Sequence, residues 1–254
     1  MAGAADALAI ELRDVTKSFG RVAVLAGVDL SVSRHSRVGI VGPSGGGKTT
    51  ILKIVAGLLD PDTGLARVED AASPRQRLAR CALMPQRDLL LPWRTALDNA
   101  AIALQNQGLS RAEARDRTRP LFERFGLASF EDARPGELSG GMRQRVSFLR
   151  TLMADKDVLL LDEPFGALDS ITRAQMQEWL LQAMDAVPRT VLLVTHDVEE
   201  ALLLSRRVVV LSQRPGRVVA VLDADHRGEG SRREIVTSPE FVTLKEQALE
   251  ALGA

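Results

Sequence analysis

The stretch GPSGGGKT, residues 42–49, combines closely spaced glycines with a lysine and a threonine. An apolar segment precedes it and a segment with helical spacing follows it, so the backbone can curl until successive N–H groups and the helix dipole face phosphate oxygens. Lys48 is then predicted to bridge the β- and γ-phosphates, and Thr49 to ligate Mg²⁺. A glycine-rich turn without a ligand is the alternative, which the flanking strand and helix disfavour. The predicted phosphate-binding residues are Gly42, Pro43, Ser44, Gly45, Gly46, Gly47, Lys48, Thr49 and Thr50.

Two adjacent carboxylates end the apolar run DVLLLDEP, residues 157–164. Open α/β sheets place their chemistry at the carboxyl ends of buried strands. Because successive strand residues face opposite directions, Asp162 is predicted to reach the Mg²⁺ shell and Glu163 an attacking water. The alternative is a solvated strand end whose acids cap the next turn. The presence of a phosphate loop in the same chain favours the catalytic interpretation.

Two further polar side chains end apolar strands. His196 follows the run TVLLVT and is expected at the same edge as Glu163, within reach of a γ-phosphate. Gln86 follows the run RCALMP and can contact Mg²⁺ or the attacking water. An isolated histidine is usually structural, and that interpretation is kept for the two remaining histidines, His35 and His226.

Acidic residues also mark two predicted helix starts. Asp197, with Glu200 further along the same segment, is predicted to form a capping box. Asp169 follows a turn of small residues. It is predicted either to cap the helix that begins at Ser170 or to contact a partner chain.

Alternating strand and helix patterns must position these groups. Apolar, β-branched runs predict strands at 8–12, 37–42, 80–85, 157–164, 190–197, 206–212 and 216–222. Helical spacing occurs at 48–58, 96–107, 110–125, 140–154, 170–186 and 197–204. This alternation indicates an α/β domain with a mostly parallel sheet, and residues 87–156 are expected to be a helical insertion between two of its strands. The polar stretch 223–234 is predicted to be a loop, and 238–252 a capped terminal helix.

Composition limits the remaining choices. A chain of 254 residues with 45% hydrophobic content can bury the core of one domain with a subdomain. Lys plus Arg and Asp plus Glu are equal at 33 each, which argues against nucleic acid as a partner. The single Cys81 is expected to be a buried apolar residue in a reducing compartment. The sequence shows neither a signal peptide nor an apolar run of about 18 residues, so we expect a chain that is soluble by itself.

The order of motifs GPSGGGKT, Gln86, LSGGMRQR, VLLLDEP, ALD and His196 resembles the ATP-binding subunit of ABC transporters over nearly the whole chain. The resemblance implies a P-loop NTPase with a RecA-like core, an antiparallel β portion at 7–35 and an inserted helical subdomain. It implies one nucleotide-binding domain, 1–254, with the helical subdomain at about 87–156 and a helical tail at about 231–254. Phe19 would stack on adenine where the family often has Tyr, and Gly166 stands where the family often has Ser.

The family also implies that two such chains sandwich two ATP molecules head to tail. The residues that would contact nucleotide across the dimer, or complete its site, are Ser139, Gly140, Gly141, Gln144 and Asp169. ATP and Mg²⁺ would be the cofactors. Ser139 would then start a helix aimed at the γ-phosphate that the other chain holds.

Three segments, 89–100, 211–217 and 238–249, look like those of the importers for nitrate, sulfonates, taurine and pyrimidine precursors. This implies an ATP-hydrolysing motor on the cytoplasmic face of the inner membrane, coupled to a separate permease and indirectly to a solute-binding protein, and importing a small anion, a sulfonate or a related solute. Residues 89–95, LLLPWRT, are predicted to form a groove for a permease helix or, alternatively, to pack the helical subdomain.

Other activities remain as alternatives. An exporter motor shares the same chemistry. A soluble ABC ATPase that acts on DNA or ribosomes would be expected to carry a long coiled coil or a second phosphate loop, and the sequence shows neither. A P-loop kinase would need an acceptor site, for which LSGGMRQ leaves no role.

Overall fold

The computed structural model describes residues 7–166, 168–186, 188–224 and 232–253. The strands are β1 Leu8–Phe19, β2 Val22–Ser33, β3 Arg37–Val41, β4 Thr63–Val68, β5 Cys81–Met84, β6 Val158–Asp162, β7 Thr190–Thr195, β8 Arg207–Leu211 and β9 Val218–Asp223. The α-helices are α1 Lys48–Val55, α2 Pro74–Arg80, α3 Ala96–Ala100, α4 Ile102–Asn106, α5 Arg111–Arg124, α6 Gly140–Leu152, α7 Ser170–Ala186, α8 Val198–Leu204, α9 Arg232–Val236 and α10 Pro239–Leu252. Short 3-10 turns lie at Ala128–Phe130 and Pro135–Glu137.

The larger sheet has the strand order β5-β6-β7-β3-β8-β9. All neighbouring pairs are parallel except β8 and β9, so the predicted mostly parallel sheet is confirmed. Strands β6 and β7 are buried at every position, which explains why their sequences are continuous apolar runs.

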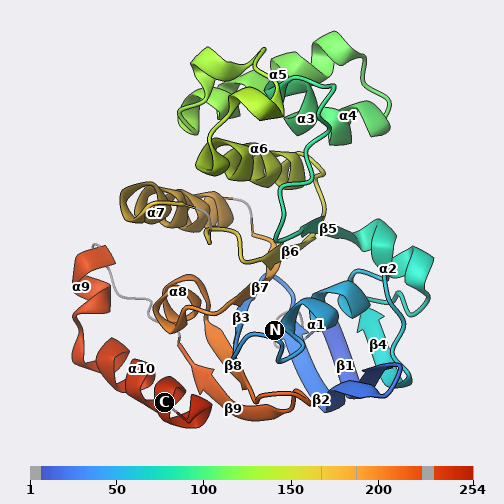
Figure 1. Ribbon diagram of the computed structural model, residues 1–254, viewed down its shortest axis with the longest axis vertical. Helices are drawn as coiled ribbons and strands as arrows, with labels where there is room; N and C mark the ends of the chain where they lie inside the picture. Colours follow the sequence, from blue (N-terminus) through green and yellow to red (C-terminus); the bar gives the residue numbers. More distant parts are fainter. Residues whose placement is uncertain (1–6, 167, 187, 225–231, 254) are drawn as a thin grey trace, which may run out of the picture.

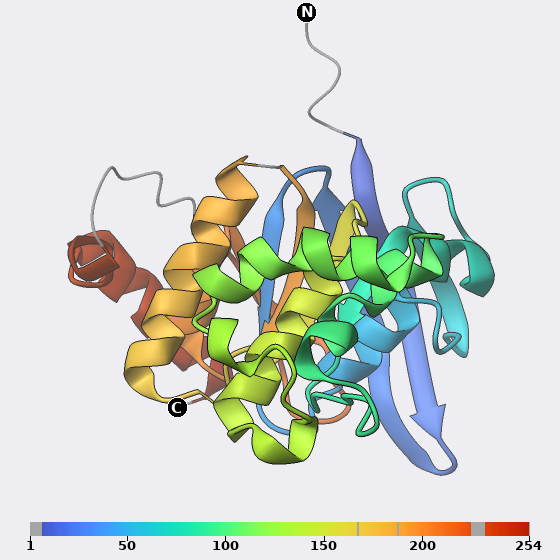
Figure 2. The same cartoon turned by 90° about the horizontal axis from the view of Figure 1, so that it is seen from above.

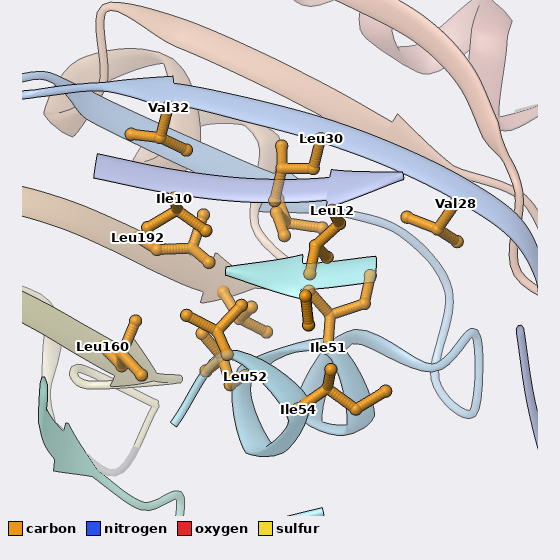
Figure 3. Packing of buried hydrophobic residues seen from close by; sticks show 14 of the residues in the cluster. Ile10, Leu12, Val28, Leu30, Val32, Ile51, Leu52, Ile54, Leu160 and Leu192 are labelled. Carbon is orange, nitrogen blue, oxygen red and sulfur yellow. The ribbon is translucent and has the colours of Figure 1, made fainter. Parts of the chain in front are cut away.

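A smaller antiparallel sheet with the order β2-β1-β4 covers α1 from the other side. Its apolar face and that of the larger sheet enclose α1 in one core, where Ile51 and Leu52 meet Ile10, Leu12 and Leu192 (Figure 3). The third strand, β4, was missed because the sequence TGLARV has only short alternating apolar positions at a sheet edge. Helix α2 was also missed, because only Arg77 of that helix is buried and its pattern is almost entirely polar.

Helices α3 to α6 lie in sequence between β5 and β6 and gather on one side of the molecule, away from the small sheet (Figures 1 and 2). The helical spacing predicted at 96–107 is confirmed, as two short helices, α3 and α4, that are separated only at Ala101. Helix α6 packs on α3 and on the larger sheet through Val146, Phe148 and Leu149. It therefore connects this group of helices to the strand ends.

The C-terminal part packs on α8 and β8 through α10, which buries Phe241 and Ala248. Ser238 caps α10 by accepting a hydrogen bond from the Phe241 N–H, so the predicted capped helix is confirmed. The predicted loop at 223–234 lies mostly outside the described residues, and its last part is the helix α9 instead. No helix in the described part of the chain is both long and apolar enough to span a bilayer.

Candidate functional site

The register of the larger sheet brings the strand-end residues together. Leu161 of β6 pairs with Met84 of β5 and with Leu193 of β7. Counting two residues onward along each strand reaches Gln86, Glu163 and the residue before His196. The three predicted catalytic side chains therefore meet at one edge of the sheet because their strands are parallel neighbours.

The loop after β3 curls beside this edge. Gly47 has φ 93°, and a Cβ there would come 2.5 Å from Leu25 Cδ2, so only glycine fits. The Lys48 ammonium donates to the Gly42 carbonyl at 2.8 Å and to the Pro43 carbonyl at 3.0 Å. The loop borders a cavity of about 270 Å³ lined by Val24, Ser44, Gly45, Gly47, Lys48, Thr49, Thr50, Gln86 and Glu163.

Thr49, which lines this cavity, contacts a buried carboxylate. Thr49 Oγ1 donates to Asp162 Oδ1 at 3.1 Å. Burial raises the pKa of Asp162 and outweighs the Thr49 hydrogen bond, which lowers it. Burial likewise lowers the pKa of Lys48, whereas the negative charges of Glu163 and Asp162 raise it. A Mg²⁺ ion close to Asp162 would lower the pKa of this carboxyl, and a phosphate close to Lys48 would raise the pKa of the ammonium, because an opposite charge favours the charged form.

The oxygen atoms here suit Mg²⁺. Mg²⁺ is usually bound by one or two carboxylates together with substrate phosphates, and it prefers hard oxygen ligands. Thr49, Asp162 and the Gln86 carboxamide offer such atoms beside the phosphate loop. Within the described residues no group of three or more His, Cys, Asp or Glu is placed to hold a metal by itself.

Glu163 is held in an unusual conformation. Its φ is 48°, in the left-handed region that costs a non-glycine residue on the order of 1 kcal/mol or more. Its N–H donates to the Val194 carbonyl at 2.8 Å. Gln86 Nε2 donates to Glu163 Oε2 at 3.1 Å, and His196 Nδ1 lies 3.4 Å from Oε1. The Glu163 carboxylate thus lies between Gln86 and His196, on a residue with a strained backbone.

The segment LSGGMRQR begins α6. Ser139 is the N-cap and accepts a hydrogen bond from the Met142 N–H at 3.2 Å, while Ser139 and Gly140 are exposed. These residues and Gly141 do not line the cavity of their own chain. Gln144, also predicted to contact nucleotide, is buried, and its Nε2 donates to the Pro164 carbonyl at 3.1 Å. The structure thus places Gln144 behind Glu163, where its amide can satisfy a buried carbonyl.

Phe19 and Asp169 also lie outside the cavity. Phe19 is 51% exposed at the β1–β2 hairpin, with the Lys17 ammonium 5.8 Å from its ring centroid. Asp169 accepts hydrogen bonds from the Ile171 and Thr172 N–H groups, so of its two predicted roles the structure shows the helix cap. Val24 also lines the cavity but was not predicted. It is an apolar strand residue of β2 in no motif, and only the packing of β2 beside the phosphate loop brings it to the cavity.

The contacts of the remaining described histidine, His35, and of the predicted capping box lie away from the cavity. His35 has a structural role, since its N–H donates to Thr190 Oγ1 and its ring Nδ1 lies 3.1 Å from the Pro188 carbonyl. His226 lies outside the described residues. Asp197 caps α8 as predicted, but the Glu200 half of the box is wrong, because Glu200 turns to Thr195.

Comparisons with known proteins agree with this geometry. Residues 25–166 match the domain family described as ABC transporter. The chain is 43% identical to the taurine import ATP-binding protein TauB of Rhizobium johnstonii, over 90% of this chain and 89% of the relative. It is 41% identical to the protein of the same name in Pseudomonas entomophila, over 89% and 88%. A dimeric ATP-binding cassette in a post-hydrolysis state, bound to ADP and Pi, superposes with a TM-score of 0.78 at 28% identity, covering 86% of this chain and 99% of that one. With a phosphate loop, paired strand-end acids and a signature helix in the expected order, the chain belongs to the ABC transporter family and is one of its ATPases.

Proposed function

We propose that this ATPase is the motor subunit of an importer and hydrolyses ATP at the edge formed by β3, β5, β6 and β7. The observation that carries the proposal is the contact of Glu163 with both Gln86 and His196, next to the loop that holds Lys48. ATP phosphates take the place of the Gly42 and Pro43 carbonyls as partners of the Lys48 ammonium. The backbone N–H groups of residues 44–50, which follow Pro43, hold the remaining phosphate oxygens.

Mg²⁺ would be held by Thr49, Asp162 and Gln86, and when bound it neutralises charge that develops on the phosphates. The chain's own groups carry the proton chemistry. Glu163 accepts the proton of the attacking water, and His196 orients that water and the γ-phosphate from the other side. Gln86 holds the Glu163 carboxylate in line until substrate arrives.

The site is completed by a second copy of the chain. At the N-terminus of α6, Ser139 and Gly140 are exposed and Gly141 is half-buried, and this end of the helix presents backbone N–H groups of the kind that bind anions. In the head-to-tail dimer these groups meet the γ-phosphate on the partner's loop, Asp169 lies near the dimer contact, and Phe19 stacks on adenine. The functional unit is one nucleotide-binding domain, 1–254, with a helical subdomain at 87–156 and a tail at 231–254.

The transported solute is a small anion such as a sulfonate, because the similar proteins are taurine import ATP-binding proteins. The chain would act on the cytoplasmic face of the membrane, bound to a permease that receives solute from a binding protein. Leu89 is 60% exposed and Trp93 71% exposed, which supports these two residues of the segment 89–95 as the permease contact. Leu90, at 8% exposed, instead packs in the core with the helical subdomain.

The experiment is purification of a tagged chain from membranes in mild detergent. We expect a permease to co-purify and the ATPase rate to rise when a sulfonate-loaded binding protein is added. Recovery with an exporter-type permease, or with ribosomes or DNA, would contradict the importer assignment while leaving the ATPase chemistry intact.

A further inference from the structure

A buried carboxyl group lies behind the histidine of the site. Glu200, in the first turn of α8, is only 6% exposed. Its Oε2 accepts a hydrogen bond from Thr195 Oγ1 at 2.6 Å, while its Oε1 has no hydrogen-bond partner among the residues that the structure describes. A buried polar atom without a partner costs about 1–3 kcal/mol, so a purely structural position would be better served by an apolar side chain.

The Thr195 hydroxyl, just before His196 in the chain, makes two hydrogen bonds to residues that follow His196. It donates to Glu200, and it accepts a hydrogen bond from the Asp197 N–H at 3.1 Å. The Asp197 carboxylate in turn accepts from the Glu199 and Glu200 N–H groups. The backbone on both sides of His196 is therefore tied to the start of α8.

The direction of the imidazole depends on that backbone. The His196 side chain is 60% exposed, so packing does little to fix its rotamer. Its Nδ1 nevertheless lies 3.4 Å from Glu163 Oε1. A rotation of the turn between β7 and α8 would move the ring away from the carboxylate, because the exposed ring follows the backbone that carries it.

We propose that Glu200 and Thr195 are positioning residues for His196, and that the bond between their side chains locks the strand-to-helix turn so that the imidazole faces Glu163 and the γ-phosphate. This proposal rests on the role of His196 in the proposed function. The carboxyl need not be charged to accept the Thr195 hydrogen bond. Burial raises the pKa of Glu200 to about 7, and the charge of Asp197 also raises it, whereas the Thr195 bond, Arg173 from α7 and His196 lower it.

The test compares variants that keep or remove this bond. Thr195→Val removes the hydroxyl at nearly constant volume, and we expect kcat for ATP hydrolysis to fall about tenfold with KM for ATP changed less than twofold. Glu200→Leu is expected to act alike. Thr195→Ser and Glu200→Gln keep a donor and an acceptor, and they should restore most of the lost rate.

The deciding measurement uses a His196→Ala background. Because Thr195 acts through the imidazole, Thr195→Val should cause no further loss there, measured by single-turnover hydrolysis and with thermal unfolding recorded for every variant. An equal tenfold loss in that background, or full activity of both Thr195→Val and Glu200→Leu, would overturn the proposal. If His196→Ala itself hydrolyses ATP normally, the role of His196 in the proposed function fails first, and the two failures are thereby distinguished.

Discussion

At the scale of single residues, the site centres on Glu163, which has an uncommon backbone conformation. Glu163 combines a left-handed φ of 48° with contacts to Gln86 and His196, and Gln144 holds the carbonyl of the next residue. Strain of this kind persists only where the surroundings fix it, and it occurs often at functional sites. The same conformation explains why adjacent acids have different partners, Asp162 with Thr49 and Glu163 with the polar edge.

Replacing Glu163 by Gln keeps the shape and the contact with Gln86 but removes the base. We expect ATP binding to remain and turnover to fall about 100-fold or more. Hydrolysis and nucleotide retention should be measured together, with Glu199→Gln as the control because Glu199 pairs with Arg232 and Lys245 away from the cavity. Near-normal turnover would remove Glu163 from its assigned role.

Lys48→Ala should weaken nucleotide binding itself. Lys48 is 6% exposed, and loss of its ammonium removes charge-assisted bonds worth about 1.5–3 kcal/mol, or about 10- to 100-fold in affinity. Lys53 lies exposed on the same helix, α1, so Lys53→Ala is the matched control. Unchanged ATP affinity of Lys48→Ala in an equilibrium binding assay would argue against the phosphate-loop assignment.

At the scale of elements, sequence patterns predicted those parts that are locally encoded. Continuous apolar runs predicted β6 and β7, and the motif after β3 predicted its loop, because each signal lies within one short segment. Contacts between distant segments were not predictable in this way. Gln144 donates to the Pro164 carbonyl, and Glu200 accepts a hydrogen bond from Thr195. Both hydrogen bonds depend on how α6 and α8 pack, which a local sequence pattern does not indicate.

Glu200, in α8, should make the free energy of unfolding depend on pH. The pKa of Glu200 is raised from 4.5 to about 7 in the folded chain, so folding favours the neutral carboxyl. Below the unfolded pKa of 4.5, Glu200 makes its full contribution of roughly 2–4 kcal/mol to the free energy of unfolding. This contribution is lost as pH rises through about 7, the pKa in the folded chain. Glu200→Gln is neutral at every pH. Its melting temperature should therefore exceed that of the natural chain at pH 8, with a gap that closes toward pH 5, and a constant gap would contradict the assignment.

The segment 89–95 should matter for coupling more than for chemistry. Trp93 is 71% exposed, so Trp93→Ala removes little from the core. We expect basal hydrolysis to stay within about twofold and transport with the permease to fall about tenfold, since aromatic residues often dominate interfaces. Uptake into vesicles, with Val242→Ala as an exposed apolar control on α10, checks this. Loss of folding in Trp93→Ala would instead support a packing role.

At the scale of the whole molecule, the phosphate loop and the start of α6 lie apart in one chain. The phosphate loop lies at the edge of the larger sheet, whereas Ser139 begins α6 in the helical group and is absent from the residues lining the cavity. The motifs predicted the loop and the helix, but the separation of these two segments depends on where α3 to α6 pack (Figure 1). In the proposed function, a second copy of the chain brings its Ser139 to this loop.

Crosslinking between two differently tagged chains tests this most directly. One chain carries Ser44→Cys on the phosphate loop and the other Ser139→Cys, both in a Cys81→Ser and Glu163→Gln background, because Cys81 is the only cysteine and we expect the Gln variant to retain ATP. Ser110 is the exposed N-cap of α5, so Ser110→Cys is the matched control for Ser139→Cys. The account predicts an ATP-dependent product containing both tags for the 44–139 pair and little for the 44–110 pair. A chain carrying both the 44 and 139 cysteines that links only within itself, with no mixed product at saturating ATP, would contradict the head-to-tail site.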